Sequence, residues 1–350
     1  MNETFEKIWQ EIDKAKSILL TLHPKADADS VGSNLGLMWA LESLTPQLPS
    51  GQGKKVTVIA GDGPIPSYLK PAPGYERIVN KNIFEVNPED YDLFLILDLS
   101  WLDRLTNKGE FKLPKNWRVI NIDHHQGANL VYRQAGLPAQ VSWVDTQMPA
   151  VGVMIYDLLK FRNIPLTYEI SANLILAISG DTGGYKYAGV NGALFTRLAD
   201  LIEYVPNYAK LIFDLENNLT PDALKFEALA LSKIEVVGGL AMSLLNYGDL
   251  KASNLLKEGE SENSFSANKL KAVVGWDIGA VLTESEPEIV KVSLRTRDAS
   301  KYDLSKIAEA LGGGGHKAAA GALIRLPLAE AKQKLIEAVR SLYPELLKLS

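Results

Sequence analysis

The spacing of hydrophobic residues in the first half of the chain predicts alternating helices and strands. Four apolar residues near the N-terminus repeat as on one helix face: Phe5, Ile8, Trp9 and Ile12. Four apolar runs have the length of strands: residues 17–22, 54–60, 92–98 and 117–123. Helical spacing returns over residues 30–43, with Asp29 or Ser30 as the expected N-cap. Because buried parallel strands are almost continuously apolar, this pattern predicts an α/β fold with a doubly wound parallel sheet.

The second half of the chain has shorter apolar runs and a different pattern. Residues 193–232 are helical in spacing, and Thr220 followed by Pro221 is typical of a helix N-terminus. Three further elements are expected beyond them: a strand at 291–297, a helix from Leu304 to the glycines at 312–315, and a helix at 328–343. We therefore predict a first domain over residues 1–195, a helical linker over 196–232 and a smaller α/β domain over 233–350.

Composition narrows the class of protein. The 350 residues are 46% hydrophobic and 23% charged, which is typical of a soluble globular protein. The net charge of −5 argues against a broad electrostatic grip on long nucleic acid. The absence of cysteine rules out disulfides and thiolate metal sites, and fits a reducing compartment. The N-terminus is not a signal peptide, and no apolar run approaches the roughly 20 residues that span a bilayer. We expect a soluble cytoplasmic protein that does not associate with membranes.

Acidic and histidine residues follow several of the apolar runs. His23, Asp27 and Asp29 follow the first, Asp98 follows the third, and residues 123–125 (Asp-His-His) follow the fourth. Asp181 follows another apolar stretch, within SGDTGGY (179–185). In open α/β sheets, ligands bind at the carboxyl ends of the strands. Each stretch alone is more typical of a turn or a helix cap, but independent turns have no reason to converge, so together they predict one site.

The residue types at these positions predict metal binding. Six side chains are candidate ligands: His23, Asp27, Asp29, Asp98, His124 and Asp181. Carboxylates mixed with imidazoles suit Mn²⁺ or Fe²⁺ better than Ca²⁺, and the lack of cysteine argues against structural zinc. Six ligands exceed what one catalytic metal takes with a position left open, so two metals sharing a carboxylate account for them. Such a pair suits phosphoester hydrolysis, because it generates hydroxide near neutral pH and neutralises phosphoryl charge.

Two features near the C-terminus have both a structural and a functional interpretation. The run GGGGH (312–316) is a plausible helix stop, or a backbone concavity that binds an anion with His316 as an added donor. Arg295 and Arg297 alternate on a strand-like run, so they are expected to face the same side. They either grip a terminal phosphate or form part of a solvated sheet face.

Taken together, these motifs resemble those of the DHH/DHHA1 phosphoesterase family. The matching stretches are HPKADADSVGS (23–33), LDLS around Asp98, IDHH (122–125), SGDTGG (179–184), VSLRT (292–296) and GGGGHKAAAG (312–321). They occur in family order from about residue 15 to residue 325. The resemblance implies a parallel-sheet DHH catalytic domain, a linker helix and a DHHA1 substrate-binding domain, with the active site in the cleft between the domains. Lys25-Ala26, Ala28 and Thr296 depart from the usual family residues, but the ligand spacing H-x-x-x-D-x-D is intact.

The resemblance also implies roles for individual residues. It places two Mn²⁺ ions, or Mg²⁺, Co²⁺ or Fe²⁺, on two ligand sets that share Asp98. One set is His23, Asp27 and Asp98, and the other is Asp29, Asp98, His124 and Asp181. His125 would face the scissile phosphate, and Asp123 would orient a histidine. The substrate's distal phosphate or nucleotide would contact a set in the small domain: Arg295, Gly313, Gly314, Gly315 and His316.

Within the family, the two-domain length most resembles nanoRNases that are also pAp phosphatases. Such an enzyme would convert short single-stranded RNA to mononucleotides, and 3′-phosphoadenosine 5′-phosphate (pAp) to AMP. A homodimer formed through the first domain is a further expectation from the family. Two alternatives stay open: a phosphodiesterase for cyclic di-AMP or its linear product, which needs the same metal chemistry, and a non-catalytic nucleotide sensor. Loss of ligands would mark a sensor, and every expected ligand is present.

Overall fold

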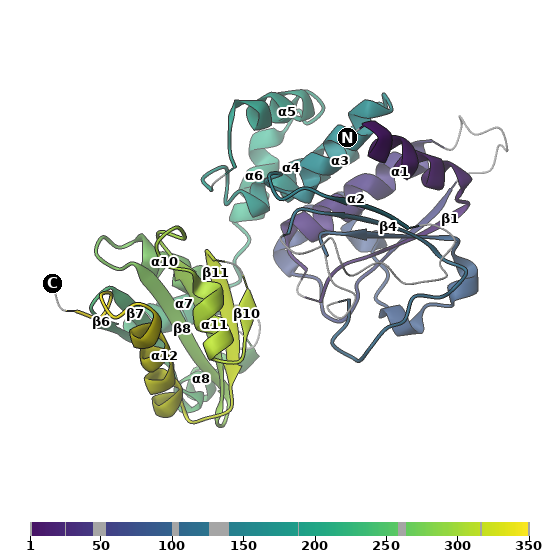
Figure 1. Ribbon diagram of the computed structural model, residues 1–350. Coiled ribbons are helices and arrows are strands. Elements are labelled where there is room, and N and C mark those ends of the chain that lie inside the picture. Colours follow the sequence, from purple (N-terminus) through teal and green to yellow (C-terminus); the bar gives the residue numbers. More distant parts are fainter. Residues whose placement is uncertain are drawn as a thin grey trace. The chain divides into compact units, whose positions relative to one another are not determined.

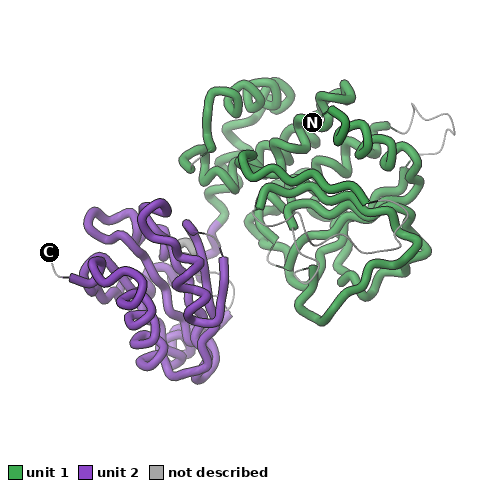
Figure 2. The backbone as a smooth tube through the Cα atoms, viewed as in Figure 1, with its two compact units in different colours: residues 1–218 green, residues 219–350 purple. Residues whose placement is uncertain are grey.

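The chain forms two compact units, residues 1–218 and residues 219–350 (Figure 2). The computed structural model describes residues 2–24, 26–44, 54–99, 105–125, 140–187, 189–257, 264–315 and 317–348. The unit boundary divides the predicted linker, because α5 (Gly192–Ile202) and α6 (Tyr208–Glu216) belong to the first unit. Helix α7 (Pro221–Ser232) belongs to the second, and Thr220 caps it by accepting the Ala223 N–H, as its sequence predicted.

The first unit is built on a five-stranded parallel sheet, as predicted (Figure 1). Its strands along the chain are β1 (Ser17–Thr21), β2 (Lys55–Ile59), β3 (Leu93–Leu97), β4 (Arg118–Asp123) and β5 (Gln140–Val144). Their spatial order is β2-β1-β3-β4-β5, and all neighbouring pairs are parallel. Strand β5 was not anticipated, because QVSWV is a short edge strand with only one fully buried residue, Trp143.

Alternate residues of these strands point to opposite faces of the sheet. One face, which includes Leu20 and Leu95, packs against four α-helices: α1 (Asn2–Lys14), α2 (Ala28–Ser43), α3 (Val151–Phe161) and α4 (Tyr168–Asp181). The other face, which includes Phe94, packs against Trp117 and the short 3₁₀ helix η4 (Ile83–Glu85), and the Trp117 side chain donates to Pro88 O in η5 (Pro88–Asp90). Two further 3₁₀ helices, η2 (Ser67–Leu69) and η3 (Tyr75–Arg77), pack with the cluster of the first face through Leu69 and Tyr75. Both faces are therefore buried, which explains the continuous apolar runs.

Small residues allow α2 and α4 to pack unusually close together. Ala28, Gly32 and Gly36 recur every fourth residue, so they share one face of α2. A Cβ on Gly32 would collide with the backbone of α4, and a Cβ on Gly180 would lie 2.5 Å from that of Ala28. The packing brings the C-terminal end of α4 to the first turn of α2. The N-cap of α2 is Asp27, whose side chain accepts the Ser30 N–H, so the prediction of Asp29 or Ser30 as the cap was wrong.

The second unit contains a six-stranded sheet with mostly antiparallel pairing. Its strands are β6 (Ile234–Val237), β7 (Leu240–Leu245), β8 (Ile278–Glu286), β9 (Ile289–Thr296), β10 (Gly314–Gly315) and β11 (Ala319–Ile324), in the spatial order β10-β11-β9-β8-β7-β6. Only β7 and β8 pair in parallel among these described strands. Helices α11 (Leu304–Ala310) and α12 (Leu328–Leu342), both predicted, cover one face.

The other face of this sheet is covered over part of its width. Helices α7, α8 (Tyr247–Ala252) and α10 (Ser264–Ala272) pack on β7 and β8 through residues such as Phe226, Leu250 and Leu270. The part of the face formed by β9 and β11 carries half-buried or exposed residues, including Arg295 and Leu323. Across both units, no helix within the described ranges has the length and apolar character needed to cross a membrane.

Candidate metal centre

The predicted site residues of the first unit meet at the carboxyl edge of its sheet. The strand order reverses between β1 and β3, and such a switch point opens a crevice at that edge. His23 follows β1, Asp98 follows β3, and the stretch 123–125 ends β4. Two more carboxylates come from helices rather than strands, because Asp29 lies in the first turn of α2 and Asp181 is the last residue of α4.

The side chains form groups whose potential ligand atoms lie within 4.8 Å of one another. The groups are His23, Asp27 and Asp98; Asp29, His124 and Asp181; and Asp98, Asp123, His124 and His125. His23 Nε2 lies 3.5 Å from Asp98 Oδ2 and 3.7 Å from Asp27 Oδ1. His124 Nε2 lies 3.0 Å from Asp181 Oδ2 and 3.6 Å from Asp98 Oδ1. Asp98 therefore contacts both histidines and joins the groups into one cluster.

The backbone of Asp98 has an unusual conformation. Its φ of 57° is in the left-handed region, which a residue with a Cβ rarely adopts. Its N–H donates to Ile122 O on β4, and the buried Asn121 side chain donates to Leu99 O at 2.9 Å. The two strands thus hold the residue where β3 ends, with its carboxylate almost fully buried. Local backbone strain of this kind is typical of functional positions.

The carboxylate of Asp29 is fixed by contacts that the sequence did not reveal. It accepts the N–H groups of Val151 and Gly152 at 2.6 and 2.9 Å, at the N-terminus of α3. It also accepts the Ser33 hydroxyl at 2.9 Å. The positive end of the α3 dipole favours the ionised carboxylate. Residues more than 120 positions away in sequence therefore orient Asp29, which is fully buried.

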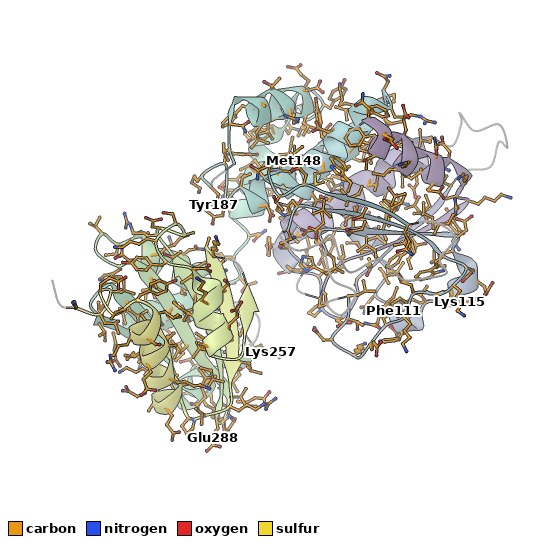
Figure 3. The ribbon with its side chains drawn as sticks, in the orientation of Figure 1. Phe111, Lys115, Met148, Tyr187, Lys257 and Glu288 are labelled. Carbon is orange, nitrogen blue, oxygen red and sulfur yellow. The ribbon has the colours of Figure 1, made fainter. Side chains whose placement is uncertain are left out.

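Hydrogen bonds also set the orientation of the His124 and His125 rings. His124 Nδ1 lies 3.1 Å from the carbonyl oxygen of Met148, which is labelled in Figure 3. A carbonyl only accepts, so Nδ1 carries the proton and Nε2 faces the carboxylates. His125 Nδ1 lies 2.7 Å from Asp123 Oδ1, an oxygen that also accepts both histidine backbone N–H groups. Asp123 thus contacts His125. The contact between His124 and the Met148 carbonyl was not predicted from the sequence.

The pKa values reflect a surplus of negative charge. Burial lowers the pKa of His23, but Asp27 and Asp98 outweigh it and raise the value to about 10. Burial likewise opposes the charged form of His124, yet Asp181 and Asp98 raise its pKa to about 12. Burial raises the pKa of Asp181 to about 6, although the nearby His124 opposes the shift. Burial and the neighbouring carboxylates of Asp98 and Asp181 raise the pKa of Asp29 well above its usual range. These are the shifts expected of carboxylates and imidazoles crowded together in a buried site.

The residues present fit divalent cations. Among the described residues, the buried atoms Asp98 Oδ1 and His124 Nε2 have no hydrogen-bond partner in good alignment, although Asp181 Oδ2 lies 3.0 Å from Nε2 and both atoms face the cluster. Buried polar atoms normally have partners, so these two atoms fit a role as ligands to a cation. Two imidazoles and four carboxylates form a donor set suited to Mn²⁺, Fe²⁺ or Mg²⁺. The arrangement can therefore concentrate positive charge at one edge of the sheet.

The predicted substrate-binding residues of the second unit have structural contacts. Arg295 lies on β9 and donates to Leu294 O at 2.8 Å. Arg297 caps the C-terminus of α10 instead of joining Arg295, because its guanidinium donates to three carbonyls there: Lys271, Ala272 and Val273. His316 lies outside the described residues.

The glycine run ends α11, as its structural interpretation predicted. The N–H of Gly312, which has a φ of 81°, donates to Glu309 O, and the N–H of Gly313 donates to Ala308 O at 2.7 Å. This pair of bonds is the Schellman motif. Gly314 and Gly315 then pair with Gly321 and Ala320 on β11. Of the two β10 residues, only Gly314 has open space where a Cβ would lie. Anion binding by the glycine run stays a prediction.

Comparison with known proteins gives matches over both units. Residues 17–178 match the DHH family, N-terminal domain, and residues 256–344 match the DHHA1 domain. A Thermus thermophilus protein named bifunctional oligoribonuclease and PAP phosphatase NrnA is 29% identical, over 92% of this chain and 89% of its own. Its Bacillus subtilis namesake is 23% identical, over 88% and 89%. The crystal structure of an exopolyphosphatase-related protein from Bacteroides fragilis has a TM-score of 0.84 at 22% identity, over 99% and 98% of the chains, which shows a shared fold.

Proposed function

Because the chain belongs to the DHH/DHHA1 phosphoesterase family, we propose that it hydrolyses very short oligoribonucleotides to mononucleotides, and pAp to AMP. The observation that carries the proposal is the cluster at the carboxyl edge, where Asp98 joins two groups of potential metal ligands. Relatives named for both activities match this chain over most of its length, which supports the choice of substrates. A cluster confined to one edge of a sheet suits a small substrate, and the net charge of −5 agrees with that size.

Two divalent cations, such as Mn²⁺, would occupy the cluster. The ligands of one would be His23, Asp27 and Asp98, and those of the other Asp29, Asp98, His124 and Asp181. When bound, such cations would act as Lewis acids toward phosphoryl oxygens and lower the pKa of water. The contacts of Asp29 with α3 and of His124 with Met148 would hold these two ligands in place without substrate. Such preorganisation matters because a ligand that must reorient weakens the site.

His125 would act directly on the substrate. Burial opposes its charged form, but Asp123 and Asp98 raise its pKa, so the ring favours the imidazolium. Asp123 holds the proton on Nδ1, which directs Nε2 as the second donor. From Nε2, His125 would donate to a phosphoryl oxygen or to the departing oxygen of the scissile ester. Asp123 is then a positioning residue that keeps the imidazolium charged and aligned.

The second unit would hold the distal part of the substrate. Arg295 projects from the β9 face opposite to the buried side chains of that strand, such as Leu294. A guanidinium there matches the geometry of a phosphate or nucleotide. The other members of the proposed binding set are Gly313, Gly314, Gly315 and His316.

Product analysis tests the proposal. The purified protein would be incubated with Mn²⁺ and, separately, a 5′-phosphorylated RNA dinucleotide, pAp and cyclic di-AMP, with an Asp98→Asn variant beside it. We expect the first two to give mononucleotides and AMP, and the variant to give neither. Cleavage of the cyclic compound alone would replace the proposal with second-messenger hydrolysis. Failure to cleave any of the three by a protein that binds Mn²⁺ would overturn the enzymatic assignment.

A further inference from the structure

A pocket of about 290 Å³ adjoins the metal cluster within the first unit. Asp27 and Asp181 form the wall on the side of the cluster, and Tyr68, Lys186, Leu215 and Glu216 are among the residues on the other sides. The volume is near the lower end of the range for small-molecule sites, about 300–1,000 Å³. The pocket can therefore hold one small group beside the reacting phosphate, but not a whole oligonucleotide.

A strained turn carries one wall of this pocket. Three consecutive residues, Gly183, Gly184 and Tyr185, have φ values of 58°, 65° and 66°. The turn is closed by Thr182, whose carbonyl accepts the N–H groups of Lys186 and Tyr187. A tyrosine in the left-handed region is rare, and strain of this kind clusters at ligand sites. The turn begins directly after Asp181, so it ties the pocket wall to a proposed metal ligand.

The charges of the pocket exclude a further phosphate as its occupant. Among its described lining residues, Lys186 is the only cation, against the carboxylates of Asp27, Asp181 and Glu216. Cations bound to the cluster would neutralise Asp27 and Asp181, which leaves Lys186 and Glu216 to balance each other. A phosphate subsite needs surplus positive charge, and this pocket has none in either state. A neutral group that offers hydrogen-bond donors fits better.

The geometry points to a nucleoside subsite: the pocket receives the sugar and base next to the phosphate that is cleaved. This inference rests on the proposed function and adds the position of one nucleoside. Tyr68 and Leu215 supply apolar surface for the base, since aromatic and aliphatic contacts tolerate any base. Glu216, on the exposed end of α6, accepts a hydrogen bond from a ribose hydroxyl or a base amino group.

Two variants test the subsite against a matched control. Glu216→Gln removes the charged acceptor, and Leu215→Trp fills the pocket. Asp214→Asn removes a carboxylate from the same helix outside the pocket, where Asp214 contacts only Lys210 through its side chain among the described residues. For each protein, KM and kcat would be measured with pAp and with p-nitrophenyl phosphate, which has no nucleoside. AMP binding would be measured by calorimetry, and circular dichroism would check folding.

We expect Glu216→Gln to raise KM for pAp and to weaken AMP binding by about tenfold, the usual effect of losing one charged hydrogen bond. Leu215→Trp should weaken both more, while turnover of p-nitrophenyl phosphate and the Asp214→Asn control stay unchanged. Equal AMP binding by wild type and Glu216→Gln would overturn the subsite while leaving hydrolysis intact. If the wild type hydrolyses neither RNA nor pAp, the proposed function fails. In that case, weaker AMP binding by Glu216→Gln and Leu215→Trp than by the wild type would still support the nucleoside subsite.

Discussion

The two sheets of this protein distribute polar side chains in different ways. In the parallel sheet, β1, β3 and β4 all end at the same edge, and their last residues bring His23, Asp98 and His124 within a few ångströms of one another. In the mostly antiparallel sheet (Figure 1), most neighbouring strands end at opposite edges. Polar residues such as Arg295 therefore lie along a face of the sheet. The parallel sheet therefore brings titratable groups together at one edge, whereas the mostly antiparallel sheet spreads its polar side chains over a face.

The difference has an energetic consequence. The carboxyl edge of the first unit crowds five carboxylates around three imidazoles, and the shifted pKa values show the electrostatic cost of that crowding. The glycine run of the second unit is used for close backbone packing, because Gly313 and Gly315 leave no room for a side chain against β11. The crowded carboxylates of the first unit need a bound cation to balance their charge. The glycine run of the second unit is held by backbone contacts within the fold.

The largest expected effect comes from removing the shared carboxylate. Asp98→Asn should lower kcat by about a thousandfold or more, because a residue joining both ligand groups is worth several kcal/mol of charge stabilisation. Asp92→Asn is the matched control, since Asp92 lies at the amino end of β3, where it accepts the Lys16 and Ser17 N–H groups. Steady-state kinetics on pAp would check both variants. Equal activities would refute the special role of the carboxyl edge.

Asp123→Asn should have a smaller effect through His125. The amide can no longer accept the Nδ1 proton as a carboxylate does, so we expect kcat to fall about 10- to 100-fold. The pKa of His125 should also fall toward its ordinary value, because a raising influence is removed. In a profile of kcat against pH, the alkaline loss of activity should therefore occur at a lower pH in the variant than in the wild type. An unshifted profile would show that Asp123 does not position His125.

Metal binding should depend on pH in a direction that the histidines determine. Without metal, the raised pKa of His23, about 10, keeps its imidazole protonated near pH 7.5, and a cation must displace that proton. The apparent affinity for Mn²⁺ should therefore rise with pH up to about 10, by about tenfold per pH unit for each proton displaced. Calorimetry in two buffers of different ionisation enthalpy would measure the proton release. Binding without release would contradict the assignment of His23 as a ligand.

The same shift predicts the opposite trend for stability without metal. A raised pKa means that the folded state binds the proton more tightly than the unfolded state, whose value is near 6.5. The contribution of His23 is therefore fully present below pH 6.5 and is lost as the pH rises through about 10. Urea unfolding of chelator-treated protein at pH 6 and pH 9.5 would compare the two. Greater stability at pH 9.5 would contradict the ion pairs with Asp27 and Asp98.

The smallest expected effect separates structural glycines from binding glycines in the second unit. Gly313→Ala should destabilise the protein by about 1–3 kcal/mol, because its Cβ would overlap Gly321 and Ala322 on β11. Gly314→Ala has open space, so its free energy of unfolding should change by less than about 0.5 kcal/mol. Thermal unfolding would measure both. A raised KM for pAp in Gly314→Ala, without lost stability, would support substrate binding by the run.

Much of the fold and of the candidate site follows from local patterns. Apolar runs of strand length predicted β1 to β4, and the helical spacing of Phe5, Ile8 and Trp9 predicted α1. The positions of the histidines and aspartates after those runs predicted that they would converge, and the structure brings them together. The edge strand β5 was missed because a short strand with one buried side chain gives little signal. The capping of α10 by Arg297 was missed because it joins residues that are 24 or more positions apart.

The sequence by itself determined which side chains enter the cluster, because the period of apolar residues sets strand ends and ligand chemistry depends on residue type. Tertiary structure alone decided how they are held. The N-terminus of α3 meets Asp29, the Met148 carbonyl meets His124, and the small residues of α2 admit α4 close enough to bring Asp181 into place. The contacts of Asp29 and His124 are made to backbone groups that carry no residue-specific signal, so only the packed chain reveals them.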